Sequence, residues 1–172
     1  MISIKVSLHK NLIFDKPTQK DLLMIQSLSE DPFYCYVFKE TSKQSDFTET
    51  LSTRYHESKA SSNDPSKVFE YIIRDDSHAF IGYLQGYYPH NPQSLWLQRL
   101  LVNKPYLQQG YGIHIMNLFI HSLKANRFHQ QLFLTCHKEN IIGHKFWTKL
   151  GFHIIKDDIQ QTHNLYCVNI RS

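Results

Sequence analysis

The chain carries, between residues 95 and 112, the stretch Leu95-Trp-Leu-Gln-Arg-Leu-Leu-Val102-Asn-Lys-Pro-Tyr-Leu-Gln-Gln-Gly110-Tyr-Gly112. Its first half is apolar and typical of a strand, and apolar side chains then recur at helical spacing from Tyr111 to Lys124. Two glycines between a strand and a helix permit a tight turn and a close main-chain approach to a ligand. The first amides of a helix have no acceptor inside it and lie at the positive end of its dipole, so such a turn is suited to phosphate. The two glycines alone also fit a simple tight turn with close packing of the helix on the sheet.

Strand-like and helical stretches alternate on both sides of this segment. Strands are predicted at residues 2–8, 12–14, 68–74, 79–87, 95–102, 131–136, 152–155 and 164–169. Helices are predicted to begin at Thr18 and to cover 47–58, 111–124 and 140–150. Antiparallel hairpins thus precede a β-α-β unit, which predicts an α/β (α+β) fold with a mixed, mostly antiparallel sheet and helices on both faces. We expect a single domain over residues 1–172, because two independent cores would be cramped in a chain of this length.

Two of the predicted helices have a defined start or a defined apolar face. Thr18 is a good N-cap, and Asp21 stands three residues later. On that helix the apolar set is Leu22, Leu23, Ile25 and Leu28. On the helix after the glycines the apolar set is Ile113, Met116, Ile120 and Leu123. We expect this second set to face the core.

Composition and charge exclude several classes of protein. With 41% hydrophobic and 13% aromatic residues against 20% charged residues, the 172-residue chain is not a disordered or low-complexity tail. The net charge of +4 is spread thinly, which gives no argument for a nucleic-acid partner. The N-terminus lacks the apolar run of a signal peptide, and no stretch is long enough to cross a bilayer. We therefore expect a soluble, cytoplasmic protein with no membrane partner.

The cysteines and histidines form no metal-binding pattern. The three cysteines are odd in number and widely spaced, which fits a reducing compartment better than a disulfide framework or a metal site. His114 and His121, like His137 and His144, are seven residues apart, and the chain contains neither H-E-x-x-H nor C-x-x-C. We therefore expect no metal.

A second motif follows about thirty residues after the glycines: Asn140-Ile-Ile-Gly-His-Lys-Phe-Trp-Thr-Lys-Leu-Gly-Phe152. Together with the glycine turn, it resembles the GNAT family of acetyl-CoA-dependent N-acetyltransferases over residues 94–155. The resemblance implies the GNAT-like acyl-CoA N-acyltransferase fold, in which the sheet splays between strands 4 and 5 and the pantetheine arm of CoA lies in the opening. It also implies acetyl-CoA as the acyl-donor cosubstrate. The stretch from Gly110 to Asn117 is similar to the histone-type branch, although this short match does not establish a histone substrate.

The resemblance assigns cosubstrate-binding roles by matching positions. The main chain of Leu100 and Val102 would pair with pantetheine like an added strand. The pyrophosphate would be held by the main-chain amides of Gln108, Gln109, Gly110, Tyr111, Gly112 and Ile113. Asn140 would contact the cosubstrate, and Gly143 takes the small position of the second motif. The side chains expected beside the acyl-bearing end are Phe146 and Trp147.

Three departures from the family pattern concern side chains. The phosphate turn usually begins with Gln or Arg, and here that place is Leu107. The aromatic pair of the second motif usually ends in a tyrosine that protonates the departing thiolate, whereas Trp147 is not a practical acid at neutral pH. Many members carry a glutamate base on the fourth strand, where this chain has Trp96. The cosubstrate-binding half of the site therefore matches the family better than the proton-transfer half.

Acyl transfer to an amine requires a neutral nucleophile and a proton for the leaving thiolate. His137, just beyond the strand predicted at 131–136, is the candidate proton carrier; the alternative is a solvent-facing loop histidine. Cys136 is a candidate for an acyl-enzyme, and the alternative is a buried strand cysteine that acts as a small hydrophobe.

Candidate acceptor-binding residues are tyrosines, for which core packing is the alternative in each case. They are Tyr34, Tyr36, Tyr87 and Tyr88. The leading hypothesis is an N-acetyltransferase that moves an acetyl group from acetyl-CoA to a primary amine by direct attack in a ternary complex. A CoA-binding or interaction module with weakened catalysis is the second hypothesis, and a transferase for a longer acyl chain is the third. The acceptor amine, small molecule or peptide, stays open, as does the choice between monomer and homodimer.

Overall fold

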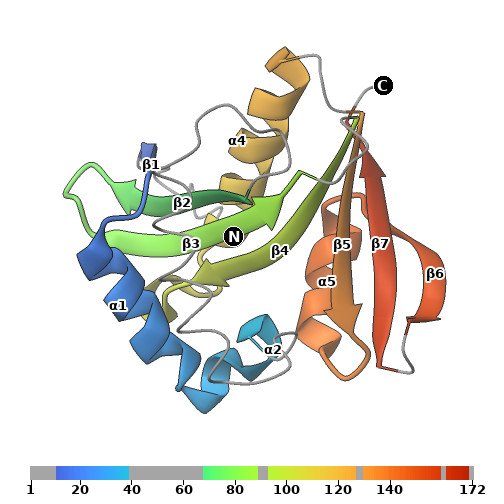
Figure 1. Ribbon diagram of the computed structural model, residues 1–172, viewed down its shortest axis with the longest axis horizontal. Helices are drawn as coiled ribbons and strands as arrows, with labels where there is room; N and C mark the ends of the chain where they lie inside the picture. The colour runs from blue at the N-terminus through green and yellow to red at the C-terminus, as the bar shows by residue number, and fades with distance from the viewer. Residues whose placement is uncertain (1–10, 39–67, 89–92, 127–129, 160–161, 171–172) are drawn as a thin grey trace, which may run out of the picture.

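The computed structural model describes residues 11–38, 68–88, 93–126, 130–159 and 162–170. Within them, seven strands form one sheet in the order β1-β2-β3-β4-β5-β7-β6 (Figure 1). The strands are β1 (Leu12–Asp15), β2 (Val68–Asp75), β3 (Phe80–Tyr87), β4 (Ser94–Val102), β5 (Gln131–His137), β6 (His153–Ile159) and β7 (His163–Asn169). The helices are α1 (Gln19–Ser29), η1 (Pro32–Tyr34), α2 (Cys35–Phe38), η2 (Lys104–Tyr106), α4 (Tyr111–Asn126) and α5 (Ile141–Lys149). Among these strands β4 and β5 are the one parallel pair, so the predicted mixed, mostly antiparallel sheet is confirmed.

The strands and helices predicted within the described residues are present, with ends that move by up to four residues. The strand predicted at 2–8 and the helix predicted at 47–58 lie outside the described residues. The short segments η1 and α2 were not predicted, because three or four residues are too few to show a hydrophobic period. None of the helices in the described ranges is long and apolar enough to span a membrane.

Helix α1 begins as the sequence predicts. The Thr18 side chain accepts a hydrogen bond from the Asp21 amide at 3.3 Å, and the Asp21 carboxylate accepts one from the Thr18 amide at 2.9 Å. Leu22 and Ile25 are buried in a cluster on the α1 face of the sheet. Leu23, a member of the apolar set, is 62% exposed, because it directly follows Leu22 and therefore points about 100° away around the helix.

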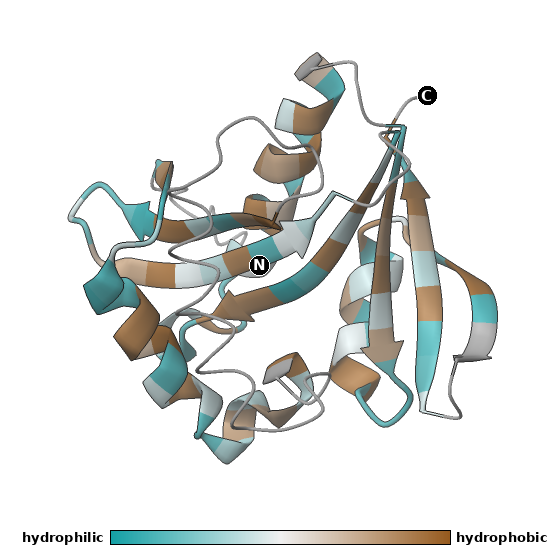
Figure 2. Ribbon diagram, viewed as in Figure 1, coloured by the Kyte–Doolittle hydropathy of each residue, from teal (hydrophilic) through white to brown (hydrophobic). Residues whose placement is uncertain are grey.

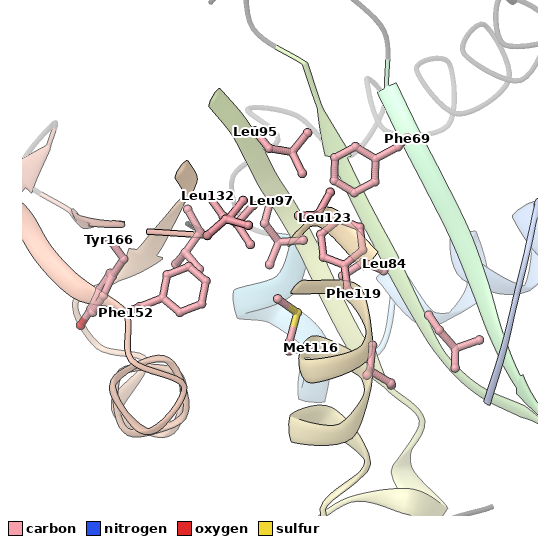
Figure 3. Close-up of a cluster of buried hydrophobic side chains, with 14 of the residues drawn as sticks. Phe69, Leu84, Leu95, Leu97, Met116, Phe119, Leu123, Leu132, Phe152 and Tyr166 are labelled. Atoms are coloured by element: carbon pink, nitrogen blue, oxygen red, sulfur yellow. The ribbon is translucent and has the colours of Figure 1, made fainter. Parts of the chain in front are cut away.

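Helix α4 covers the other face of the sheet. Figure 3 shows Met116, Phe119 and Leu123 directed toward Leu84 and Leu97. Met116 and Leu123 are buried as predicted, whereas the other two predicted positions, 113 and 120, are only half-buried. Residues 115 and 119 take their places, because the buried stripe of α4 is rotated slightly from the one expected.

A β-bulge lies in the middle of β4, where Figure 2 shows a hydrophilic break in a mostly hydrophobic strand. Gln85 on β3 is opposite Arg99, but the next residue, Gly86, is opposite Leu97. Gln98 is therefore the extra residue of the bulge, and the alternation of faces inverts across it. Before the bulge, Leu97 packs on the α4 face.

After the bulge, the odd-numbered residues of β4 face α1. Leu101 belongs to the α1-side cluster, and Arg99 is 3% exposed beside it. The Arg99 guanidinium donates to the Gln85 side-chain oxygen, and the Gln85 amide donates to a Glu70 carboxylate oxygen at 2.6 Å. The even-numbered residues Leu100 and Val102 are therefore free to lie on the α4 side, partly buried against that core.

The sheet opens between β4 and β5. The two strands pair only from Ser94 to Leu97 and then diverge, which leaves the V-shaped gap seen in Figure 1. The Asn103 amide donates to the Ile81 carbonyl on the β3 side at 2.8 Å. In an antiparallel pair, every second residue of a strand directs its main-chain N–H and C=O groups to the same neighbouring strand. The main-chain groups of Leu100 and Val102, at the alternate positions, thus point away from β3 and into the gap. The predicted splay of strands 4 and 5 is confirmed.

Candidate functional site

A cavity of about 570 Å³ occupies the open end of the V. Figure 1 shows α2 at this end, between the diverging strands. Three segments supply most of its walls, at residues 32–37, 100–102 and 139–143, with Leu107, Gly112, Phe146 and Trp147 completing them. The walls are mainly apolar, which suits an extended organic ligand rather than a bare ion.

The turn that leads from β4 to α4 presents main-chain amides next to this cavity. Gln108 and Gly110 both have left-handed backbone conformations, with φ of 58° and 88°. The Gln109 side-chain amide donates to the Pro105 carbonyl at 2.6 Å and so fixes the turn. The first hydrogen bond of the helix runs from the His114 amide to the Gly110 carbonyl, which leaves the preceding amides outside the helical pattern. This geometry fits the predicted anion cradle at residues 108–113, and the left-handed Gln108 is a feature the sequence did not reveal.

The two glycines of the turn have different roles. A Cβ atom added to Gly110 would meet no atom within 4 Å, so glycine is required there for its positive φ and not for space. A Cβ atom added to Gly112 would lie 3.1 Å from the Phe146 ring and 3.5 Å from Val102 Cγ2. Gly112 therefore allows α4 to start close to α5 and β4. The tight turn at Gly110 and the close packing at Gly112 are thus both present, and phosphate binding by this turn stays a prediction.

Asn140 forms the start of α5 at the cavity wall. Its side-chain oxygen accepts a hydrogen bond from the Gly143 amide at 2.8 Å. A Cβ atom at Gly143 would lie 2.6 Å from Asn140 Nδ2 and 2.9 Å from Cys136 Sγ, so the small residue of the motif makes room for both side chains. Cys136 is buried, as the small-hydrophobe interpretation expects. One turn further on, the rings of Phe146 and Trp147 lie 4.7 Å apart, and both line the cavity.

His137 is the last residue of β5 and is not a solvent-facing loop residue. Its side chain is 13% exposed and its Nδ1 atom accepts a hydrogen bond from the Glu139 amide at 3.2 Å. The neutral ring is therefore assigned its proton on Nε2, and the lone pair that a general base needs is already engaged. The ring lies 5.4 Å from that of Tyr36 and 5.0 Å from that of His163. His137 thus lies behind Tyr36 and not on the described cavity wall.

The structure separates the four candidate tyrosines into two pairs. Tyr34 and Tyr36 line the cavity. The buried Tyr34 hydroxyl donates to the Val102 carbonyl at 3.2 Å, and burial raises the pKa of Tyr34. Tyr87 stacks on Trp96 at 6.0 Å and Tyr88 packs against the core, away from the described cavity wall. Burial raises the pKa of Tyr88 as well.

Two wall residues of chemical interest were not singled out from the sequence. Glu139 is the one carboxylate on the described wall, and its side chain is 70% exposed. Glu139 immediately precedes Asn140, and this position in the second motif could have identified it as a candidate site residue from the sequence. Cys35 also lines the cavity, through α2, which had no recognisable period. In the part of the chain that the structure describes, no three His, Cys, Asp or Glu side chains are grouped as a metal site requires.

Comparisons with known proteins agree with this geometry. A family model described as acetyltransferase (GNAT) family matches residues 22–152. Spermidine N-acetyltransferase from Vibrio cholerae, solved with CoA and spermine, is 14% identical with a TM-score of 0.72, over 92% of this chain and 95% of that one. An acetyltransferase from Thermus thermophilus is 20% identical with a TM-score of 0.68, over 92% and 97%. A GNAT-family acetyltransferase from Staphylococcus aureus is 18% identical with a TM-score of 0.68, over 95% and 100%. A search among curated proteins finds no match.

Proposed function

The chain belongs to the GNAT family of acetyltransferases, and on this premise we propose that it transfers an acetyl group from acetyl-CoA to a primary amine by direct attack in a ternary complex. The observation that carries the proposal is that two sets of main-chain hydrogen-bond donors border the same cavity. The open edge of β4 forms one side of the cavity, and the amide turn before α4 lies at its end.

On the donor side, the proposed contacts are mainly to the backbone. Pantetheine amides would pair with the main chain of Leu100 and Val102, which points into the gap. The pyrophosphate would accept hydrogen bonds from the amides of residues 108–113, at the positive end of the α4 dipole. Leu107 cannot add a polar side-chain contact, so the backbone must supply most of the phosphate binding. The spermidine N-acetyltransferase solved with CoA and spermine supports a CoA donor and an amine acceptor for this fold.

On the acceptor side, charge and shape favour a cationic amine attached to an apolar group. The Glu139 carboxylate attracts an ammonium ion to the rim of the cavity, while the walls inside are largely apolar. An ammonium that leaves water for such walls loses its proton more readily, which produces the neutral nucleophile that attack requires. Holding the two substrates side by side then supplies a large part of the acceleration.

The attack forms a tetrahedral centre whose negative oxygen needs hydrogen-bond donors. The amides of Leu100 and Val102 point into the gap where the thioester would lie, and they are fixed by the sheet before the substrate arrives. Main-chain donors of this kind need no reorganisation during the reaction. The open edge of β4 would therefore bind the donor and also stabilise the charge that develops on it.

The proposal is tested by titrating the purified protein with CoA in a calorimeter and by measuring thiol release from acetyl-CoA with a panel of amines. We expect saturable CoA binding and thiol release with at least one amine that carries an apolar group. Absence of CoA binding would contradict the proposal.

A second candidate is a CoA-binding module with weakened catalysis. The observations in its favour are Trp147 on the cavity wall and the engaged Nδ1 atom of His137. CoA binding without thiol release above background for any amine would support this second candidate over the enzyme.

A further inference from the structure

A thiolate that leaves from a thioester must take up a proton, and the described cavity wall offers few groups that can donate one. Its polar side chains are Tyr34, Cys35, Tyr36, Glu139 and Asn140. Asn140 has no acidic proton, and its oxygen caps α5. The Glu139 side chain is 70% exposed, so it lies mostly in solvent and not inside the cavity.

Two further wall residues are poorly suited for different reasons. The Tyr34 hydroxyl is buried and directs its proton to the Val102 carbonyl at 3.2 Å, so the proton is held at the β4 edge. A proton from the exposed Cys35 thiol would only move from one sulfur to another, which gives little driving force. Tyr36 is the wall residue left, and its phenol hydroxyl can donate a proton to a thiolate.

A row of two imidazole rings begins beside Tyr36. Its half-buried ring lies 5.4 Å from the imidazole of His137, which in turn lies 5.0 Å from that of His163. His163 Nδ1 is 2.7 Å from the hydroxyl of the exposed Thr162. Two imidazoles thus lie between the Tyr36 ring at the cavity wall and the exposed Thr162.

We propose that Tyr36 is the general acid of acyl transfer and protonates the departing CoA thiolate; this inference rests on the proposed function. The amine nitrogen attacks the carbonyl carbon, the C–S bond breaks, and its electron pair goes to sulfur. The O–H bond of Tyr36 breaks and its proton goes to the same sulfur. The proton that the amine nitrogen loses restores the phenol. Acetyl-CoA and the amine thus become the N-acetylamine and CoA.

The test uses the full chain and three variants. Tyr36→Phe removes only the hydroxyl. Tyr71→Phe is the matched control, because Tyr71 packs on Phe14 and Phe119 and lies outside the described cavity wall. The double variant Tyr36→Phe/Trp147→Tyr places a phenol on the same cavity from α5.

At saturating amine, Tyr36→Phe is expected to lower kcat by about 100-fold while leaving the calorimetric Kd for CoA unchanged. Tyr71→Phe should stay within about twofold of the parent protein, since no step uses its hydroxyl. The double variant should recover about tenfold in kcat. The pH–rate profiles of the parent and of Tyr36→Phe should also differ, because only the parent carries the phenol hydroxyl.

Three results overturn the inference. The first is a kcat for Tyr36→Phe close to that of the parent. The second is a large loss with no recovery in the double variant and a pH–rate profile of Tyr36→Phe that has the same shape as the parent's, which assigns Tyr36 a packing role. The third is a parent protein that binds CoA but acetylates no amine, which also removes the proposed function. In the first two cases the acetyltransferase stands and only the role of Tyr36 falls.

Discussion

Replacing Gly110 by alanine tests whether the turn before α4 is the phosphate cradle. Gly110 has φ of 88°, and an added Cβ atom would meet nothing within 4 Å. The methyl group therefore creates no clash within the protein, and the penalty comes from the left-handed backbone alone. That penalty is about 1–2 kcal/mol for an alanine.

Gly151 provides a control with the same backbone demand at another place. It has φ of 86°, and an added Cβ atom there also meets nothing within 4 Å. It ends α5, where its amide donates to the Thr148 carbonyl and the Phe152 amide donates to the Trp147 carbonyl. Gly151→Ala should therefore lower the free energy of unfolding by about the same 1–2 kcal/mol, and it should not alter CoA binding.

The two variants are compared by urea denaturation and by CoA calorimetry. If the turn of Gly110→Ala keeps its shape, the backbone strain lowers the free energy of unfolding. If the turn instead relaxes to another shape, CoA binding must restore the left-handed conformation, and the strain lowers the affinity for CoA. In the second case the affinity for CoA falls about 5–30-fold, since 1–2 kcal/mol corresponds to that range. The added methyl group projects into space that holds no protein atom, and if this turn binds the phosphate we expect the methyl group to crowd it and to lower the affinity in both cases. A folded Gly110→Ala protein that binds CoA as tightly as the parent would refute the cradle.

Three other changes have defined outcomes. His137→Ala should lower kcat, because Tyr36 loses the ring packed beside it, and should leave the Kd for CoA nearly intact; an unchanged kcat would contradict this dependence. Burial raises the pKa of Asp21, but hydrogen bonds from Thr18 and then Arg74 hold that pKa below its ordinary value. The ionised carboxylate therefore stabilises the fold at pH values above the ordinary pKa, and this contribution is lost as the pH falls through the lowered pKa. Asp21→Asn should therefore reduce the free energy of unfolding by about 2 kcal/mol at pH 7 and flatten its decline in acid, as followed by urea denaturation; an equal slope in both proteins would argue against it. Asn140→Ala should reduce the free energy of unfolding by about 1 kcal/mol, and Asn140→Ser should restore most of it; equal stability of the two variants would show that the cap is unimportant.

Features that depend on a few neighbouring residues could be predicted from the sequence. The capping box of Thr18 and Asp21 and the left-handed Gly110 are of this kind, because each follows from residues within one turn. The bulge at Gln98 could not be predicted, because both faces of β4 carry leucines and only its register with β3 identifies the extra residue. The exposure of Leu23 likewise depends on where the sheet lies against α1.

The candidate site divides in the same way. The part of the site built from main-chain groups could be predicted from the sequence, because glycine, asparagine and the apolar strand directly indicate a turn, a helix cap and a strand edge. Its side-chain half was less accessible, since Tyr36 meets His137 only when α2 packs against the end of β5. The four tyrosines had equal standing in the sequence, and tertiary packing alone places Tyr34 and Tyr36 on the cavity wall and Tyr87 on Trp96.

The gap between β4 and β5 has a consequence for how such a chain tolerates substitution. The groups that this opening offers are peptide nitrogens and carbonyl oxygens, which every residue type except proline carries in full. Most changes of side chain along the open edge therefore leave its hydrogen-bonding capacity intact, provided that the strand keeps its path. Structures with only 11–20% identity to this chain keep the same fold. Divergence can thus proceed on the opposite wall, where side chains determine which molecule is accepted, while the peptide edge persists unchanged.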